Sequence, residues 1–313
     1  MWRGRTVAVV LPTYNEKDSI RAAILEYVAT GFVDQVIVVN NNAAPGTSEE
    51  VAGTGAREIF ETKQGYGHAL MCGIDDCTAD LIVLAEPDNT FTGQDLIKLL
   101  AYSDDVPVVF GTRTSREFIW TGANMGRFLR IGNWAVAKMT EVLFNTTILT
   151  DMGCTYRLFH RKALALIRPH LNIGGSHFGP QLLMEVVEHG IPFVEIPVNY
   201  RARVGVSSVT GDLWKAFRLG LRMIALILEY RLGVHSKARS LWDPRDNIRA
   251  QPDVVGIGPA EGAHSTLGLQ ALAAVTPRER NLRGEEDSLR LREAALQLRE
   301  ENIRRAEKPG PRG

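Results

Sequence analysis

Residues 80–91, Asp-Leu-Ile-Val-Leu-Ala-Glu-Pro-Asp-Asn-Thr-Phe, decide the fold that the sequence predicts. The four consecutive apolar residues from Leu81 to Leu84 are typical of a strand that is buried on both faces of a sheet. The strand is followed by Glu86 and Asp88. Side chains at positions i and i+2 of an extended chain point to the same side, so we expect these carboxylates to converge. Paired hard oxygen ligands suit Mg²⁺ or Mn²⁺.

The same acidic residues also fit an ordinary loop, because short acidic triplets are common in turns. Pro87 fixes its own φ angle and favours an extended conformation for Glu86. The triplet alone favours the loop. The rest of the chain reverses this preference, because polar residues also follow two earlier predicted strands.

Apolar runs and helical patterns alternate along the first half of the chain. Strands are predicted at residues 7–11, 35–39, 58–60, 81–84 and 106–110, with helices at residues 19–27, 68–74 and 94–102. This alternation predicts an α/β fold with a doubly wound, mainly parallel sheet. Ligands of such sheets bind at the carboxyl ends of the strands. Three of these ends carry polar pairs, which are Asn15 and Glu16, Asn40 and Asn41, and Glu86 and Asp88.

The composition is that of an ordinary folded protein of 313 residues, with a net charge of zero and 45% hydrophobic residues. No excess of basic residues indicates a nucleic-acid partner. The three cysteines contain no Cys-x-x-Cys pair, so neither a disulfide framework nor a zinc site is expected. We therefore expect a reduced, cytoplasmic compartment. We also expect no signal peptide and no membrane span.

Seven short motifs follow one another along the chain. They are V-V-L-P-T-Y-N-E at 9–16, V-I-V-V-N-N-N at 36–42, Q-G-Y-G-H-A-L at 64–70, L-A-E-P-D at 84–88, G-T-R at 111–113, T-D-M-G-C-T-Y-R at 150–157 and Y-R-A-R-V-G-V-S-S at 200–208. In order and spacing they resemble the family-2, GT-A-type glycosyltransferases, in particular the dolichyl- and polyprenyl-phosphate sugar transferases. The resemblance covers about residues 5–232.

The resemblance implies a Rossmann-like GT-A fold and a UDP- or GDP-sugar as donor. It assigns the metal motif to Glu86 and Asp88, with Mg²⁺ or Mn²⁺ as cofactor. Our candidate catalytic residues are Asp88, Arg157, which the resemblance also implies for phosphate groups, and Asp151 as a fallback base. Residues implied for the nucleotide pocket are Pro12, Tyr14, Glu16, Asn40, Asn41, Gln64, Gly65 and Gly67. Residues implied for phosphate groups of donor or acceptor are Arg113, Arg127, Arg130, Arg201, Arg203 and Ser207.

Three positions depart from the family pattern. Asn40 stands where an Asp is usual, Glu86 replaces the first Asp of the metal motif, and Val209 stands where a Lys often follows the serines. The longer side chain of Glu86 can still reach a metal ion. Asn40 leaves the identity of the bound base open.

The expected mechanism follows from the charge of the leaving diphosphate. A divalent cation at Glu86 and Asp88, together with arginines, would neutralise it. Hydroxyl-transferring relatives carry a Glu-Asp pair near Gln181, and its aspartate acts as the base. Residues 177–181 contain no carboxylate, and a phosphate acceptor, already ionised at neutral pH, needs no base. We therefore expect inverting transfer to a polyprenyl phosphate.

Two other functions remain open at this point. A hydroxyl-directed glycosyltransferase of polysaccharide or cell-envelope synthesis, with a glycan acceptor, would need a base, for which Asp151 and His177 are candidates. A catalytically weak sugar-nucleotide-binding scaffold is suggested by Asn40, Glu86 and the added C-terminal tail. A sugar-phosphate nucleotidyltransferase is disfavoured, because residues 11–20 lack the expected Gly-rich loop with its Arg and Lys.

The chain is expected to comprise a catalytic domain at 1–232, a linker or loosely ordered segment at 233–276 and a charged helical tail at 277–313. Further elements predicted in the domain are helices at 126–143, 178–188 and 213–232 and a strand at 193–200. The helix at 213–232 is amphipathic, which suits peripheral contact with the cytoplasmic face of a membrane. Packing on the domain or on a second subunit is the alternative. The charged tail is more typical of a solvated helix without a partner than of a partner-binding or dimerising helix.

Overall fold

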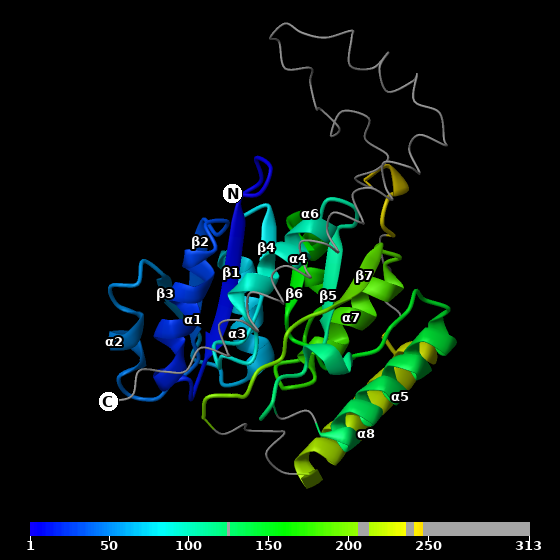
Figure 1. The fold of residues 1–313 in the computed structure, drawn as a ribbon. Helices are drawn as coiled ribbons and strands as arrows, with labels where there is room; N and C mark the ends of the chain where they lie inside the picture. Colours follow the sequence, from blue (N-terminus) through cyan, green and yellow to red (C-terminus); the bar gives the residue numbers. More distant parts are fainter. Residues whose placement is uncertain (124–125, 206–212, 236–240, 247–313) are drawn as a thin grey trace, which may run out of the picture. The chain divides into compact units, whose positions relative to one another are not determined.

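The computed structural model describes residues 1–123, 126–205, 213–235 and 241–246. The chain divides into two units, 1–254 and 255–313, and every described residue belongs to the first. The described residues form a seven-stranded sheet in the order β3-β2-β1-β4-β6-β5-β7 (Figure 1). Its strands are β1 (Val7–Thr13), β2 (Gln35–Asn40), β3 (Arg57–Phe60), β4 (Leu81–Leu84), β5 (Val108–Thr112), β6 (Arg157–His160) and β7 (Phe193–Pro197).

The sheet is mainly parallel, which confirms the predicted fold class. β1 pairs in parallel with both β2 and β4, β2 with β3, and β5 with β7. β6 is antiparallel and lies between β4 and β5, where Arg157 is opposite both Leu84 and Phe110. The sequence did not predict β6, because it is four residues long and begins and ends with a polar residue. Its position brings the loop before it, residues 150–156, to the carboxyl ends of β4 and β5.

Helices cover both faces of the sheet. Alternate strand residues such as Val9 and Val83 pack against α1 (Lys17–Ala29) and α4 (Leu96–Tyr102), whereas Val10 and Leu84 face α3 (Tyr66–Asp76) and α7 (Phe178–Glu188). In α1, apolar residues spaced three and four apart turn one face to the sheet. All four residues of β4 are buried, as predicted. The site is therefore built at the end of a fully buried strand.

Two long helices of the described unit lie side by side (Figure 1). They are α5 (Arg127–Phe144) and α8 (Leu213–Arg231), and both were predicted from the sequence. The short helices α2 (Thr47–Val51) and α6 (Arg161–Ile167) complete the α-helical elements of the described chain. None of the described helices combines the length and the apolar character that crossing a membrane requires.

Part of the predicted linker is anchored to the domain. Trp242 is buried in the core, and its backbone N–H donates to the carbonyl of His189 at 2.8 Å. The charged tail predicted at 277–313 lies outside the described residues, so its helical structure remains a prediction.

Candidate active site

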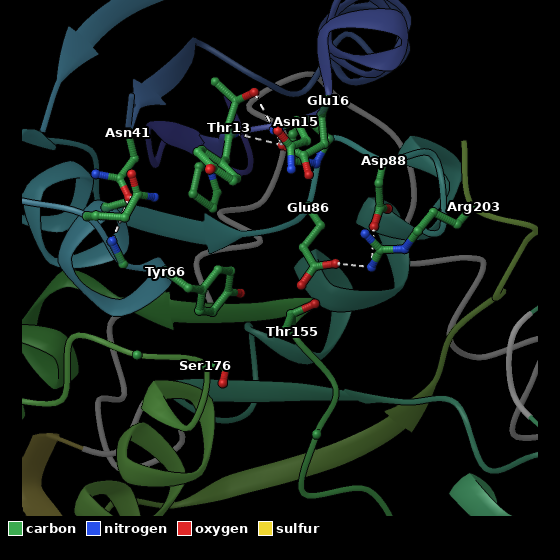
Figure 2. Close-up of a pocket in the computed structure, with 18 of the residues that line it drawn as sticks. Thr13, Asn15, Glu16, Asn41, Tyr66, Glu86, Asp88, Thr155, Ser176 and Arg203 are labelled. Carbon is green, nitrogen blue, oxygen red and sulfur yellow. Dashed lines mark hydrogen bonds and ion pairs between the residues drawn. The ribbon is translucent and has the colours of Figure 1, made fainter. Parts of the chain in front are cut away.

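A cavity of about 400 Å³ opens where β1, β2 and β4 end (Figure 2). Polar residues that follow these strands line it, including Glu16, Asn41, Glu86 and Asp88. The three strand ends therefore meet at one site, as the sequence predicted. The cavity is lined by Pro12, Thr13, Tyr14, Asn15, Glu16, Asn41, Gln64, Gly65, Tyr66, Ala69, Glu86, Pro87, Asp88, Arg113, Gly153, Thr155, Gly175, Ser176, Tyr200, Arg203 and Leu219.

Glu86 and Asp88 form an acid pair that is bridged by one guanidinium. Nη2 of Arg203 lies 3.0 Å from Oε2 of Glu86 and 2.6 Å from Oδ2 of Asp88 (Figure 2). The other oxygen of Asp88 accepts hydrogen bonds from the backbone N–H and the hydroxyl of Thr90. Asp88 is only 1% exposed. The hydrogen bonds from Thr90 therefore fix the orientation of the Asp88 carboxylate, with Oδ2 directed towards the cavity.

The acid pair is unusual in its protonation. Burial and the neighbouring Asp88 carboxylate raise the pKa of Glu86 to about 8, although Arg203 acts in the opposite direction. Glu86 therefore holds its proton more tightly than an ordinary glutamate does, while the guanidinium of Arg203 lies close enough to balance negative charge at the pair. A divalent cation would favour ionisation of both carboxylates.

The chemistry of these residues fits a divalent cation. They offer hard carboxylate oxygens, which Mg²⁺ and Mn²⁺ prefer. Oδ2 of Asp88 is buried, and its contact with Arg203 is an ion pair without the alignment of a hydrogen bond. Glu86 and Asp88 are thus the residues that could hold a metal ion here.

Two other lining side chains, Glu16 and Asn41, fix the backbone of the loops around the cavity. The carboxylate of Glu16 accepts the N–H groups of Tyr14 at 2.8 Å and Asn15 at 3.0 Å, which fixes the turn after β1. Oδ1 of Asn41 accepts the N–H of Gly65 at 2.8 Å, and its amide donates to the carbonyl of Glu61 at 2.7 Å. These bonds fix the backbone of the two loops that form part of the cavity wall.

Asn40 lies outside the cavity lining. Its amide nitrogen donates to Glu58 at 2.8 Å, and its oxygen accepts the N–H of Ala43 at 2.9 Å. It is 8% exposed. The structure thus engages this side chain in the loop after β2, and its predicted contact with a nucleotide remains a prediction.

Two predicted glycines allow a close backbone approach. The N–H of Gly67 donates to the carbonyl of Gly174 at 2.9 Å, and a Cβ at Gly67 would lie 2.0 Å from the carbonyl oxygen of Ile173. A Cβ at Gly65 would lie 2.3 Å from the oxygen of Gly174. Gly67 itself does not line the cavity. The close contact of Gly65 and Gly67 with residues 173–174 places Ser176, which follows shortly after them in the chain, in the cavity wall.

The region that carries a Glu-Asp pair in hydroxyl-transferring relatives holds an amide here. Gln181 is fully buried, accepts the N–H of Ile173 at 2.9 Å and donates to the carbonyl of His170 at 3.2 Å. His177, a candidate base, does not line the cavity. Burial and the charge of Arg222 lower its pKa.

Arg113 reaches the cavity with a fixed partner behind it. Its Nε lies 2.9 Å from Oδ2 of Asp151 and its Nη2 lies 3.0 Å from Oδ1. Asp151 is buried and lies outside the lining. Burial raises the pKa of Asp151, but its pair with Arg113 outweighs burial and leaves that pKa below its ordinary value. Asp151 is thus an ionised counter-ion, which makes it a poor proton acceptor.

Three further candidates within the described residues, Arg130, Arg157 and Arg201, do not line the cavity. Arg157 is buried and donates to the carbonyls of Cys154 at 2.7 Å and Gly179 at 2.6 Å. Arg201 donates to Glu26 at 2.7 Å. Arg130 is elsewhere on α5, while Ser207 and the side chain of Arg127 lie outside the described part of the chain.

Several lining residues were not among the predicted ones. Thr155 and Tyr200 belong to motifs that carry the family resemblance, so their positions in the sequence signalled the site, and Tyr66 lies within the stretch from Gln64 to Gly67 that the resemblance implies beside the pocket. Burial, and then the charge of Glu86, raise the pKa of Tyr66 well above its ordinary value. Ser176 and Leu219 carried no such signal, because their place depends on how α7 and α8 pack.

The family model for glycosyl transferase family 2 matches residues 8–167, just over half of the chain. The chain belongs to this family. The predicted family and the predicted enzyme class are confirmed, and this family-2 protein is a glycosyltransferase.

Curated relatives support the same assignment. Over 229 residues the glycosyltransferase is 29% identical to a dolichyl-phosphate hexose transferase of Haloferax volcanii, covering 72% of this chain and 96% of the relative. It is 27% identical over 224 residues to the low-salt glycan biosynthesis hexosyltransferase Agl6 of the same organism, but spans only 53% of that protein.

A solved structure shows the same fold. Glucosyl-3-phosphoglycerate synthase from Mycobacterium tuberculosis, in complex with Mn²⁺, UDP and glucosyl-3-phosphoglycerate, matches with a TM-score of 0.55 at 17% sequence identity. The match covers 77% of this chain and 82% of that one. At this identity the likeness establishes the GT-A-like architecture of the family-2 protein and no more.

Proposed function

We propose that this glycosyltransferase transfers a sugar, with inversion, from a UDP- or GDP-sugar to a polyprenyl phosphate, with the help of Mg²⁺ or Mn²⁺. The observation that carries the proposal is the position of Glu86 and Asp88. These two carboxylates follow β4 and line the cavity at the carboxyl ends of the strands. Two relatives are named for transfer to a dolichyl phosphate or an undecaprenyl phosphate. The nucleotide and the sugar are left open.

On the donor side, Glu86 and Asp88 would hold the ion, which when bound neutralises the leaving diphosphate. Arg113 supports the same task, because Asp151 holds its guanidinium in place at the cavity wall. A preorganised charge needs no rearrangement when the negative charge develops. The turn fixed by Glu16 and the loop fixed by Asn41 provide the wall on which a nucleotide would lie.

On the acceptor side, the cavity offers no suitable base. Among the described residues, the carboxylates that line it are Glu16, Glu86 and Asp88. Glu16 is engaged by backbone N–H groups, and the other two would hold the ion. A phosphate acceptor is ionised at neutral pH and needs no base. This favours a phosphate over the hydroxyl acceptor of the alternative function.

A second cavity supports a lipid-linked acceptor. It measures about 330 Å³, lies between α5 and α8, and shares Arg113, Gly153, Tyr200 and Leu219 with the first cavity. The rest of its wall is mostly apolar and includes Leu129, Val136, Phe217, Met223 and Ile224. An acceptor with an anionic head near Arg113 and an apolar chain fits this arrangement.

The outer faces of α5 and α8 support peripheral contact with a membrane. They carry large apolar side chains that are 43–80% exposed, and apolar faces of this kind insert into the headgroup region. These residues are Ile131, Trp134, Val142, Trp214, Phe217, Leu221 and Leu228. Flotation with anionic vesicles tests the contact. A stable dimer that covers this face would favour a second subunit instead.

The function is tested with purified protein, Mn²⁺, a panel of labelled UDP- and GDP-sugars, and two acceptors with the same chain. We expect transfer to undecaprenyl phosphate, loss of transfer with a chelator, and no transfer to undecaprenol, which ends in a hydroxyl. NMR of the product should show the inverted anomeric configuration. Transfer to hydroxyl acceptors alone would overturn the phosphate acceptor. Binding without turnover of any sugar nucleotide would favour a scaffold.

A further inference from the structure

Arg203 stands where a metal ion would have to bind. A single nitrogen atom, Nη2, contacts Glu86 at 3.0 Å and Asp88 at 2.6 Å. An ion held by the same two oxygens would occupy the same space as this nitrogen. The side chain of Arg203 is 21% exposed, and Figure 2 shows its guanidinium pointing towards both Glu86 and Asp88. The guanidinium and a divalent cation are therefore competitors.

The backbone around Arg203 is held independently of its side chain. The N–H of Arg201 donates to the carbonyl of Thr90 at 2.8 Å, and the N–H of Val204 donates to the carbonyl of Asp88 at 3.0 Å. These two bonds lie on either side of Arg203 and fasten the segment beside the acid pair. Rotation of the flexible Arg203 side chain can therefore release the carboxylates without unfolding the segment.

We infer that Arg203 is an exchangeable counter-ion of the acid pair. In the metal-free protein it neutralises Glu86 and Asp88, which would otherwise lie buried without compensation. The divalent cation displaces it, and the released guanidinium becomes available to the diphosphate of the donor. The inference rests on the proposed function, because it takes the metal ion to bind at this pair.

The exchange has a thermodynamic consequence. A cation that binds alone must displace the guanidinium and leave it without a partner, so its affinity is lowered. A nucleoside diphosphate supplies a new partner, so the cation and the nucleotide strengthen each other's binding. Arg203 should therefore weaken the binding of Mn²⁺ alone while strengthening the coupling between Mn²⁺ and nucleotide.

The test measures Mn²⁺ binding to the full chain by electron paramagnetic resonance of free Mn²⁺, with and without UDP or GDP. We expect Arg203→Gln to bind Mn²⁺ alone about tenfold more tightly than the wild type, and to lose a similar factor of the coupling with the nucleotide. Arg116→Gln is the matched control, since it removes one charge at an exposed residue outside the cavity lining. It should leave both values unchanged.

The outcomes separate this inference from the proposed function. Equal or weaker Mn²⁺ binding by a folded Arg203→Gln protein, with unchanged coupling, overturns the exchange and leaves metal-dependent transfer intact. Absence of Mn²⁺ binding by every protein, even with nucleotide, overturns both. Should Arg203→Gln not fold, Arg203→Met keeps the aliphatic stem of the side chain and must show the same tighter binding.

Discussion

The two arginines at the cavity, Arg113 and Arg203, are held in opposite ways. Arg113 has a counter-ion of its own, because Asp151 binds its guanidinium through both carboxylate oxygens. Arg203 pairs instead with Glu86 and Asp88, which the proposed reaction needs for a metal ion. An arginine whose counter-ion has no other ligand is a fixed charge. An arginine whose counter-ions also bind a metal ion can change position when that ion binds.

The fixed arginine belongs to a larger, partly buried network, here termed the rigid corner (Arg113, Thr150, Asp151 and Glu195). Glu195 on β7 accepts the N–H and the hydroxyl of Thr150, at 2.7 and 2.6 Å, and the N–H of Asp151 at 2.9 Å. The sheet thus positions Asp151, and Asp151 positions Arg113. Nothing comparable supports the side chain of Arg203 within the described residues apart from the acid pair itself.

The largest expected effect is that of Asp88→Asn, which weakens the cation site and removes a partner of Arg203. Turnover should fall by about 10²–10³-fold or more, since a main source of charge stabilisation is lost. The measurement is steady-state transfer over a range of Mn²⁺ concentrations. Asp18→Asn, at an exposed acid outside the cavity lining, should behave as wild type. Unchanged turnover and metal dependence in Asp88→Asn would refute the proposed function.

Breaking the rigid corner should cost stability as well as activity. Asp151→Asn leaves the guanidinium of Arg113 largely buried without a counter-charge, and removal of one partner of a buried pair destabilises by about 3–5 kcal/mol. Urea unfolding of Asp151→Asn, Arg113→Gln and the double variant measures the effect. We expect the double variant to lose less stability than the sum of the single ones. Strict additivity would show that the two residues do not act as a unit.

Much of the fold and part of the site could be predicted from the sequence. The run from Leu81 to Leu84 indicated a strand buried on both faces, and the spacing of Glu86 and Asp88 placed both at one edge of the sheet. Both features depend only on residues that are close together in the sequence, so a short sequence pattern is enough to predict them. The β6 strand was missed because its four residues show no apolar run, and its place between β4 and β5 depends on long-range pairing.

The roles of individual arginines could not be predicted from the sequence in the same way. Arg113, Arg157 and Arg203 all stand in motifs that resemble the family, yet only Arg113 and Arg203 line the cavity. Arg157 turns to the carbonyl groups of Cys154 and Gly179 instead. The partner that decides between these outcomes is distant in the sequence for Arg113 and Arg203, and a motif does not reveal it.

The pH dependence of stability tests how Glu195 supports the rigid corner. Burial raises the pKa of Glu195 to about 7, although hydrogen bonds from Thr150 and Asp151 oppose this. The folded protein therefore binds this proton more tightly than the unfolded chain does, and the stability so gained is present below about pH 4.5 and is lost as the pH rises through 7.

Wild type should accordingly lose about 1–3 kcal/mol relative to Glu195→Gln between pH 5 and pH 8, because Gln does not ionise. The two proteins are compared by urea unfolding at each pH, and only the change in their difference is interpreted. Any hydrogen bonds that the Gln variant lacks lower its free energy of unfolding by the same amount at every pH, so they do not affect how the difference changes with pH. A difference that stays level across this range would mean that Glu195 titrates near its ordinary pKa.

The smallest expected effect concerns where the acceptor chain lies relative to the two arginines. Gly220 lines the apolar cavity between α5 and α8, and a Cβ at this position meets no atom within 4 Å. Gly220→Leu should therefore fold and fill part of that cavity. If the prenyl chain starts beside Arg113, the KM for undecaprenyl phosphate should rise by about three- to tenfold, the equivalent of one or two displaced methylene contacts.

Gly220→Ala is the matched control, since it improves helix propensity in the same way but leaves the cavity open. A short prenyl phosphate, whose chain ends before the cavity, should show the same KM with both variants. Mn²⁺ binding should not change, because Arg203 and the acid pair lie outside this wall. An equal rise in KM for short and long acceptors would place the chain elsewhere, and the rigid corner would then serve the donor alone.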